Sequence, residues 1–269
     1  MSDTGYYDDA HKASGDALRA AIRRDAFGED IGQFSWLTAD EHRRFFEWLG
    51  LDSSSHVLEV ACGSGGPALF MAETVGCRVT GVDIHEGGVA TASAAASERG
   101  LADRAVFKCV DARRPLPFPD AGFDAVICID SINHMYERGA VLAEWLRVLR
   151  PGGLALFTDP IMVSGLLRRE EMLIRSNAMG EFVFTPPGVD ESLLREAGFA
   201  DVRVEDVTSN MADVAEAWAA SRERHRDDLE RIEGTEAYAA FQHFLEVVGT
   251  LARERRLSRI AYVAARPEQ

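Results

Sequence analysis

The sequence predicts an α/β fold built on a doubly wound, mostly parallel sheet of seven strands with helical cap insertions. Short apolar runs alternate with segments of helical periodicity, and this alternation is typical of βαβ units. Several runs are apolar nearly throughout, as strands covered on both faces must be. The length of 269 residues, 46% of them hydrophobic, suffices for one domain with a substantial core.

Five strands are expected first. They are the runs HVLEVA, RVTGVDI, AVFKCVD, FDAVICID and GLALFTD, which begin at residues 56, 78, 105, 123 and 153. Helices are expected over 17–26, 39–49 after a capping Thr38, 67–75, 88–99 and 139–149. A helix and a Pro-rich turn over 161–187, the helix DESLLREAGF, a sixth strand DVRVEDV, a long helical stretch over about 211–255 and a seventh strand RIAYVAARP complete the pattern.

We therefore expect a single domain over residues 1–269. Residues 1–50 would form an N-terminal helical cover and 51–160 the core that binds a cofactor. Two helical insertions, 161–187 and 211–255, would form a cap over the substrate.

Composition restricts the partners. The formal net charge of −15 disfavours nucleic acid, since an acidic surface repels phosphate backbones. No apolar run is long enough for a membrane span, and the polar N-terminus does not look like a secretory signal, so we expect no membrane partner and a cytoplasmic location. The four cysteines, which we expect to be reduced, buried and structural, lack the paired spacing of a metal site, and no metal is predicted: Cys62, Cys77, Cys109 and Cys128.

Acidic residues stand at or next to the ends of four of the first five strands: Asp83, Asp111, Asp130 and Asp159. The first strand instead carries Glu59 and continues into the loop CGSGG. In a doubly wound sheet ligands bind beyond the carboxyl ends of the strands, at the point where the strand order reverses. A row of acids along that edge indicates a ligand site.

The loop and two of the acids suit an adenosyl group. Gly63 and Gly65 let the backbone approach a ligand closely. Asp83 can accept hydrogen bonds from both hydroxyls of a ribose. Asp111, with the amide of Ala112 beside it, can bind the amino group of adenine. The sequence therefore predicts a bound adenosyl cofactor.

The segments VLEVACGSGG, VTGVDI, VDARRPLPFPDAGFDAVICID and LRVLRPGGLALFTDP resemble the class I S-adenosylmethionine-dependent methyltransferases. The likeness is good over about residues 30–160 and general over 185–266. It implies a Rossmann-like sheet, S-adenosylmethionine as methyl donor, S-adenosylhomocysteine as product and a small-molecule methyl acceptor. The oligomeric state is left open, with a homodimer as one option.

The resemblance also assigns residues to the donor. Glu59 and the 61–65 loop would hold the methionine part, Asp83 the ribose, Asp111 and Ala112 the adenine, and Ile129 to Ser131 the amino group. The full cofactor-binding set is Gln33, Trp36, Glu59, Ala61, Cys62, Gly63, Gly65, Asp83, Ile84, Asp111, Ala112, Ile129, Asp130 and Ser131. Ala61 departs from the family, because a glycine usually stands at this first loop position.

Gln33 and Trp36 would close over the donor, because the corresponding segment covers it in the family; packing in the core is the alternative. Within the family, the segments GEDIGQFSW and IDSINH look like the branch that methylates small amines such as sarcosine, dimethylglycine or phosphoethanolamine. A phenol or a carbon acid remains open as acceptor.

His134 is the candidate catalytic base or acceptor ligand. It follows the fourth strand, where the methyl group should emerge, and imidazole titrates near neutral pH. A histidine with only local hydrogen bonds is the competing interpretation.

Two alternatives concern the whole function. A nicotinamide-dependent oxidoreductase would explain the glycine loop and Asp83 but not Glu59 or the third and fourth acids. A protein that binds S-adenosylmethionine without catalysis would keep the same donor residues.

Overall fold

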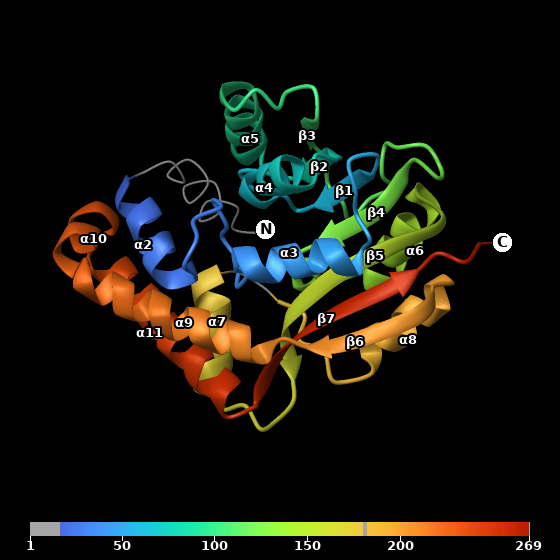
Figure 1. Cartoon of the computed structure of the whole chain (residues 1–269). Coiled ribbons are helices and arrows are strands. Elements are labelled where there is room, and N and C mark those ends of the chain that lie inside the picture. The colour runs from blue at the N-terminus through green and yellow to red at the C-terminus, as the bar shows by residue number, and fades with distance from the viewer. Residues whose placement is uncertain (1–16, 180–181, 269) are drawn as a thin grey trace.

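The computed structural model of the chain describes residues 17–179 and 182–268, with the backbone alone over 175–179. Within these ranges seven strands form one sheet in the order β3-β2-β1-β4-β5-β7-β6 (Figure 1). The strands are β1 (His56–Val60), β2 (Arg78–Asp83), β3 (Ala105–Cys109), β4 (Phe123–Cys128), β5 (Leu149–Val163), β6 (Ala200–Asp206) and β7 (Leu257–Ala265). Only β7 runs antiparallel, between β5 and β6. The predicted seven-stranded, mostly parallel sheet is confirmed.

Helices cover both faces of the sheet, which explains why β1, β2 and β4 are buried nearly throughout, whereas β6 at the edge of the sheet is mostly exposed or half-buried. Side chains alternate between the faces along each strand, so Val57 packs in one hydrophobic core and Leu58 in the other. The first core is closed by α3 (Ala39–Trp48), α4 (Gly66–Val75) and α5 (Glu86–Glu98), and the second by α6 (Arg138–Val148) and α8 (Val189–Ala197). The predicted cap of α3 is also confirmed: the hydroxyl of Thr38 accepts a hydrogen bond from the amide of Glu41 at 3.2 Å.

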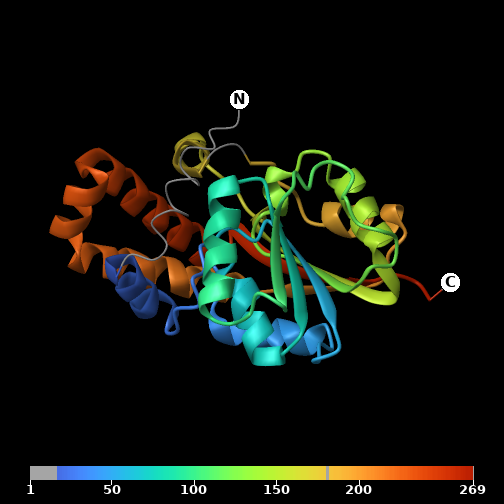
Figure 2. The same ribbon diagram turned by 90° about the horizontal axis from the view of Figure 1, so that it is seen from above.

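The remaining helices form a lobe beside the sheet (Figures 1 and 2). It contains α2 (Ala17–Phe27), α7 (Arg169–Met179), α9 (Thr208–Arg224), α10 (Arg226–Glu233) and α11 (Thr235–Arg253). Its apolar core includes Trp218 and Phe244, and it also receives Trp36 from the connection between α2 and α3. The lobe therefore joins an early and a late part of the chain.

Three expectations need correction. The helical stretch over 211–255 is three helices, because the chain turns at His225 and at Gly234, where φ is +87°. Strand β5 begins at Leu149, four residues before the predicted start, so the turn at 151–153 lies within it. Cys109 is exposed at the end of β3, whereas Cys62, Cys77 and Cys128 are buried as expected.

No helix among the described residues is long and apolar enough to cross a lipid bilayer.

Candidate functional site

The strand order brings the predicted site residues to one edge of the sheet. Strands β2, β1 and β4 are neighbours, and the order reverses between β1 and β4, where the chain first crosses to the other side of β1. Glu59, Asp83 and Asp130 lie at or just beyond the carboxyl ends of these strands, and Asp111 follows β3 at the side of β2. This edge is where ligands bind in doubly wound sheets.

The loop from β1 to α4 has a backbone shape that few residues can adopt. Ala61, Gly63 and Gly65 all have positive φ, at 59°, 54° and 77°. A Cβ on Gly65 would lie 2.6 Å from the Cβ of Ala92, so no larger side chain fits there. Ala61 adopts a left-handed conformation that favours glycine, at a cost in backbone strain. Alanine at this position therefore still allows the left-handed turn of the loop.

Asp83 holds this loop in place. Its Oδ2 accepts a hydrogen bond from the amide of Gly63 at 2.8 Å, and its Oδ1 accepts one from the amide of His85 at 2.9 Å. Each carboxylate oxygen has a second lone pair, which leaves capacity for a ligand hydroxyl. The next residue, Ile84, is 44% exposed and presents an apolar surface at the rim.

Glu59 is buried beside this loop, and one of its two carboxyl oxygens lacks a hydrogen-bond donor. Its Oε2 makes no hydrogen bond to the described residues. Burial, and to a smaller extent the nearby charge of Asp83, raises the pKa of Glu59 to about 8. An unsatisfied buried carboxylate of this kind fits a bound ammonium group, so the chemistry of the site agrees with the amino group of the predicted donor.

Asp111 lies at the rim, where Arg113 holds it from three nitrogen atoms. The Arg113 amide, Nε and one terminal nitrogen donate to its two oxygens at 3.1, 2.8 and 3.0 Å. This pairing lowers the pKa of Asp111. Ala112 follows it and is partly buried against the second core. Asp111 is therefore an ionised acceptor with a fixed orientation.

The carboxylate of Asp130 is already used by the protein. Its Oδ1 accepts hydrogen bonds from Arg259 Nε and from the Thr158 hydroxyl, both at 2.7 Å, and its Oδ2 accepts one from the Trp36 amide at 2.9 Å. Asp130 has a positive φ of 53°. Next to it, the Ser131 hydroxyl donates to the carbonyl of Ile129 at 3.0 Å. The Asp130 amide also donates to the Thr158 hydroxyl at 2.9 Å, and the Ser131 carbonyl accepts from the His134 amide at 3.1 Å. What this segment can still offer a ligand is the second lone pair of its backbone carbonyls.

Residues 28–37, which we call the covering loop, pack against the glycine loop. A Cβ on Gly66 would meet the carbonyl oxygens of Ile31 and Gly32. Gln33 is buried, accepts a hydrogen bond from the Ile31 amide at 2.9 Å and donates to the Glu29 carbonyl at 3.1 Å. These contacts favour a structural role for the Gln33 side chain.

The Trp36 ring also packs inside the protein. Its centroid lies 6.1 Å from that of Phe244 in a stacked arrangement and 6.2 Å from that of Trp218. The packing interpretation therefore accounts for its side chain, while its backbone amide connects the covering loop to Asp130.

His134 ends a short 3₁₀ turn, η1 (Ile132–His134), directly after β4. Its half-buried ring lies 4.8 Å from that of Phe182, centroid to centroid. The neighbouring Asn133 carbonyl accepts a hydrogen bond from the Val183 amide at 2.9 Å. His134 therefore lies where the tip of β4 meets the insertion after β5.

Sequence reasoning missed two buried arginines. Arg259 pairs with Asp130 and Glu41, and Arg138 pairs with Asp159 and Asp190. The available signal for Arg259 was its position in β7, where every neighbour along the strand is buried. An arginine in such a strand needs carboxylate partners, but the sequence does not say which ones.

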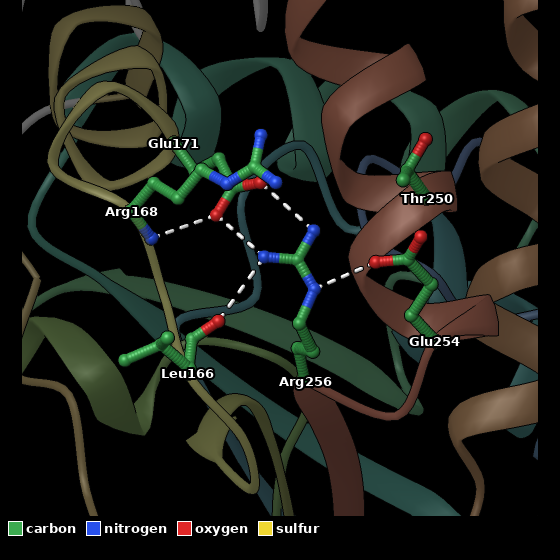
Figure 3. Close-up of a pocket in the computed structure, with 6 residues that line it drawn as sticks. All are labelled: Leu166, Arg168, Glu171, Thr250, Glu254 and Arg256. Carbon is green, nitrogen blue, oxygen red and sulfur yellow. Dashed lines mark hydrogen bonds and ion pairs between the residues drawn. The ribbon is translucent and has the colours of Figure 1, made fainter.

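A surface pocket of about 440 Å³ lies elsewhere, where the connection from β5 to α7 meets the end of α11 (Figure 3). Arg256 at its centre binds both oxygens of Glu171, at 2.7 and 2.8 Å, and one oxygen of Glu254 at 2.7 Å. Glu171 and Glu254 already neutralise Arg256, and none of the residues at the carboxyl ends of the strands lines this pocket. We therefore do not identify it as the ligand site. Among the described residues no cluster of three or more His, Cys, Asp or Glu side chains could hold a metal ion.

Residues 57–153 match the family model for a methyltransferase domain. The chain is 33% identical over 204 residues to 27-O-demethylrifamycin SV methyltransferase of Amycolatopsis mediterranei (strain S699). The aligned region covers 74% of this chain and 75% of that protein. It is 31% identical over 188 residues to sarcosine/dimethylglycine N-methyltransferase of Halorhodospira halochloris, covering 68% and 64% of the two proteins.

Among solved structures, the [4+2]-cyclase SpnF superposes with a TM-score of 0.73 at 27% identity, over 94% of this chain and 93% of that one.

Proposed function

The chain belongs to the class I S-adenosylmethionine-dependent methyltransferases of the small-molecule type, and on that premise we propose that its acceptor is a hydroxyl group on a largely apolar molecule. Membership in this family sets aside the nicotinamide-dependent alternative. We also propose which residues bind the donor and which act on the acceptor.

The residues at the strand ends suit the donor as the sequence predicts. In this proposal Glu59 binds the ammonium group, the 61–65 loop the methionine chain and Asp83 the ribose. Asp111, Ala112 and the exposed Ile84 take the adenine, and the backbone of 129–131 faces the amino end. When bound, the donor supplies a methyl carbon that its sulfonium group activates for displacement.

The observation that most supports a hydroxyl acceptor on an apolar molecule is the contact between His134 and Phe182. It places a candidate base next to an aromatic side chain of the insertion, and Phe182 and Phe184 belong to an apolar cluster with Leu251 and Leu257. Apolar walls with a few polar groups are typical of sites for small organic ligands.

The ion pairs of two buried arginines also support a hydroxyl acceptor over an acceptor that carries an anionic group. Sarcosine, dimethylglycine and phosphoethanolamine each carry a carboxylate or a phosphate that needs a cation. Arg138 and Arg259, which lie behind the tips of β5 and β4, are each bound to two carboxylates of the protein. Neither therefore has charge to spare for an anionic acceptor.

A hydroxyl group must lose its proton as its oxygen attacks. We propose that the imidazole of His134 accepts this proton in the transition state, a contribution of about 10²- to 10⁴-fold for a well-placed base. The protein must also hold the attacking oxygen about 3–3.5 Å from the methyl carbon, in line, and exclude water. We propose that the apolar segment 182–184, whose Val183 amide donates to the Asn133 carbonyl, helps to exclude water.

The test is a coupled assay for S-adenosylhomocysteine over a panel of acceptors. We expect turnover with phenols and hydroxylated polycyclic molecules and little with sarcosine, dimethylglycine or phosphoethanolamine. Product analysis should show an O-methyl group. Turnover confined to the amines would contradict the hydroxyl acceptor.

N-methylation of a small amine is the second candidate. It agrees with the preference of the sequence motifs and with the 31% identity to the Halorhodospira enzyme. The same panel separates the two candidates, because an amine acceptor, once deprotonated, does not need His134 as base.

A further inference from the structure

Arg259 occupies a fully buried position between two carboxylates from distant parts of the chain. Its Nε donates to Asp130 at 2.7 Å and one terminal nitrogen donates to Glu41 at 2.6 Å, and its side chain is 0% exposed. Asp130 lies 129 residues away in sequence and Glu41 lies 218 away. The guanidinium therefore bridges the tip of β4 and helix α3 from inside β7.

The local backbone directs Arg259 to this place. The register between β5 and β7 shifts between Asp159 and Met162, opposite residues 258–260. Such an irregularity bends a strand and can change the direction of a side chain. The amide of Arg259 donates to the Thr208 hydroxyl at 3.0 Å, which fixes this part of β7 to the start of α9.

Asp130 binds the covering loop directly, and Glu41 is connected to it through Asn210. Asp130 Oδ2 accepts from the Trp36 amide at 2.9 Å, and the side chain of Asn210 donates to the Trp36 carbonyl at 2.7 Å and to Glu41 at 3.1 Å. Both backbone groups of Trp36 are thus bound to members of one group. We call this group the Arg259 network: Arg259, Asp130, Glu41, Asn210 and the backbone of Trp36.

The energetics of the network depend on Arg259. Two buried carboxylates face one guanidinium, and burial raises the pKa of Glu41. Removing the cation would leave both acids buried with only neutral hydrogen-bond donors and, for Glu41, the more distant Arg44 at 3.7 Å, which is unfavourable for buried carboxylates. The positive φ of Asp130 adds strain that surrounding contacts must balance. Arg259 is the one cation that contacts both acids in the described network.

We propose that Arg259 is a positioning residue for the methyl donor. It acts through Asp130 and Trp36, holding the backbone of 129–131 and the covering loop in the geometry that receives the donor. It does not touch the donor itself. The inference deepens the proposed donor site and rests on it, but it is independent of the acceptor.

Arg138 provides a matched control. It is also buried and also bound to two carboxylates, Asp159 and Asp190, both at 2.7 Å. Its other contact is the carbonyl of Val183 at 3.1 Å, in the insertion after β5. Loss of the Arg138 contacts should therefore reduce stability in the same way without changing the covering loop.

The experiment compares Arg259→Lys with Arg138→Lys in the full chain. Lysine keeps the positive charge but loses the planar fork that reaches two carboxylates. We expect Arg259→Lys to raise the Kd for S-adenosylmethionine about 10-fold, because donor binding must then order backbone that a lost hydrogen bond to a charged group no longer holds. Arg138→Lys should leave that Kd within about 2-fold on the same scale. For Arg259→Lys, the KM for the donor should rise while kcat at saturating donor stays close to that of the parent.

Asn210→Ala is a second probe, because it breaks the hydrogen bond to the Trp36 carbonyl without changing any buried charge. We expect a smaller rise in the Kd for the donor in the same direction. Parent-like donor affinity in both Arg259→Lys and Asn210→Ala would overturn the inference. An equal loss of affinity in Arg138→Lys would overturn it too, since it would indicate a general effect of destabilisation. Failure of the unaltered protein to bind the donor would instead overturn the proposed donor site, and the role of Arg259 with it.

Discussion

Asp83 and Gly63 are joined by a hydrogen bond of 2.8 Å from the Gly63 amide to the Asp83 carboxylate. This contact links the end of β2 to the loop after β1, so one acid shapes the loop and, in the proposed donor site, also binds the ribose. Its two functions are therefore expected to fail together.

Asp83→Ala should weaken binding of S-adenosylmethionine roughly 10- to 100-fold, because a charged acceptor typically contributes about 1.5–3 kcal/mol. Calorimetric titration measures the change. Asp103→Ala is the control, since Asp103 is an exposed acid that precedes β3 at the opposite edge of the sheet. Undiminished affinity in Asp83→Ala would place the ribose elsewhere.

Donor binding should release a proton from Glu59. Its pKa of about 8 in the free protein means that it is mostly neutral at pH 7, while a bound ammonium group favours the carboxylate. Donor affinity should therefore rise with pH below about 8 and level off above it. Titrations at pH 7 in two buffers with different ionisation enthalpies should give different observed heats, and Glu59→Gln should abolish the difference. Equal heats for the parent protein would contradict the assignment of Glu59.

The raised pKa of Glu59 should also affect the free energy of unfolding of the protein without bound donor. The folded-state pKa of Glu59 lies above its ordinary value of 4.5, so its contribution is fully present below about 4.5 and is lost as pH rises towards 8. We expect Glu59→Gln to raise the free energy of unfolding at pH 8 more than at pH 5, as measured by urea denaturation. A pH-independent difference would show that Glu59 is already ionised.

His134→Ala should reduce turnover on the hydroxyl acceptor about 10²-fold or more, the usual contribution of a general base, with donor affinity unchanged. The measurement is kcat at saturating donor, together with the Kd for the donor. Phe182→Leu tests the neighbouring apolar wall separately, because it removes the ring contact but keeps the imidazole. Parent-like turnover in His134→Ala would remove the residue from the mechanism.

Ala61→Gly should stabilise the protein by about 1 kcal/mol, because alanine is strained at a φ of 59° and glycine is not. The reverse change at the same loop, Gly63→Ala at a φ of 54°, should destabilise it. Denaturant midpoints of the two variants test the pair. A destabilised Ala61→Gly would mean that the Ala61 methyl group makes packing contacts that outweigh the strain.

Local sequence patterns were enough to predict the sheet, the ends of its strands and the acids that lie there. Apolar runs, glycine turns and an acid after a strand are properties of neighbouring residues, and the order of such units implies a parallel sheet whose strand ends meet. The contacts of the Asp130, Gln33 and Trp36 side chains, by contrast, could be read only from the folded chain. Arg259 lies 129 residues after Asp130 and binds it because β7 inserts between β5 and β6 and a register shift lies opposite Arg259. Partners so far apart in sequence leave no local pattern. Long-range packing therefore determines whether a polar side chain such as Asp130 is free to bind a ligand or is bound to another part of the protein.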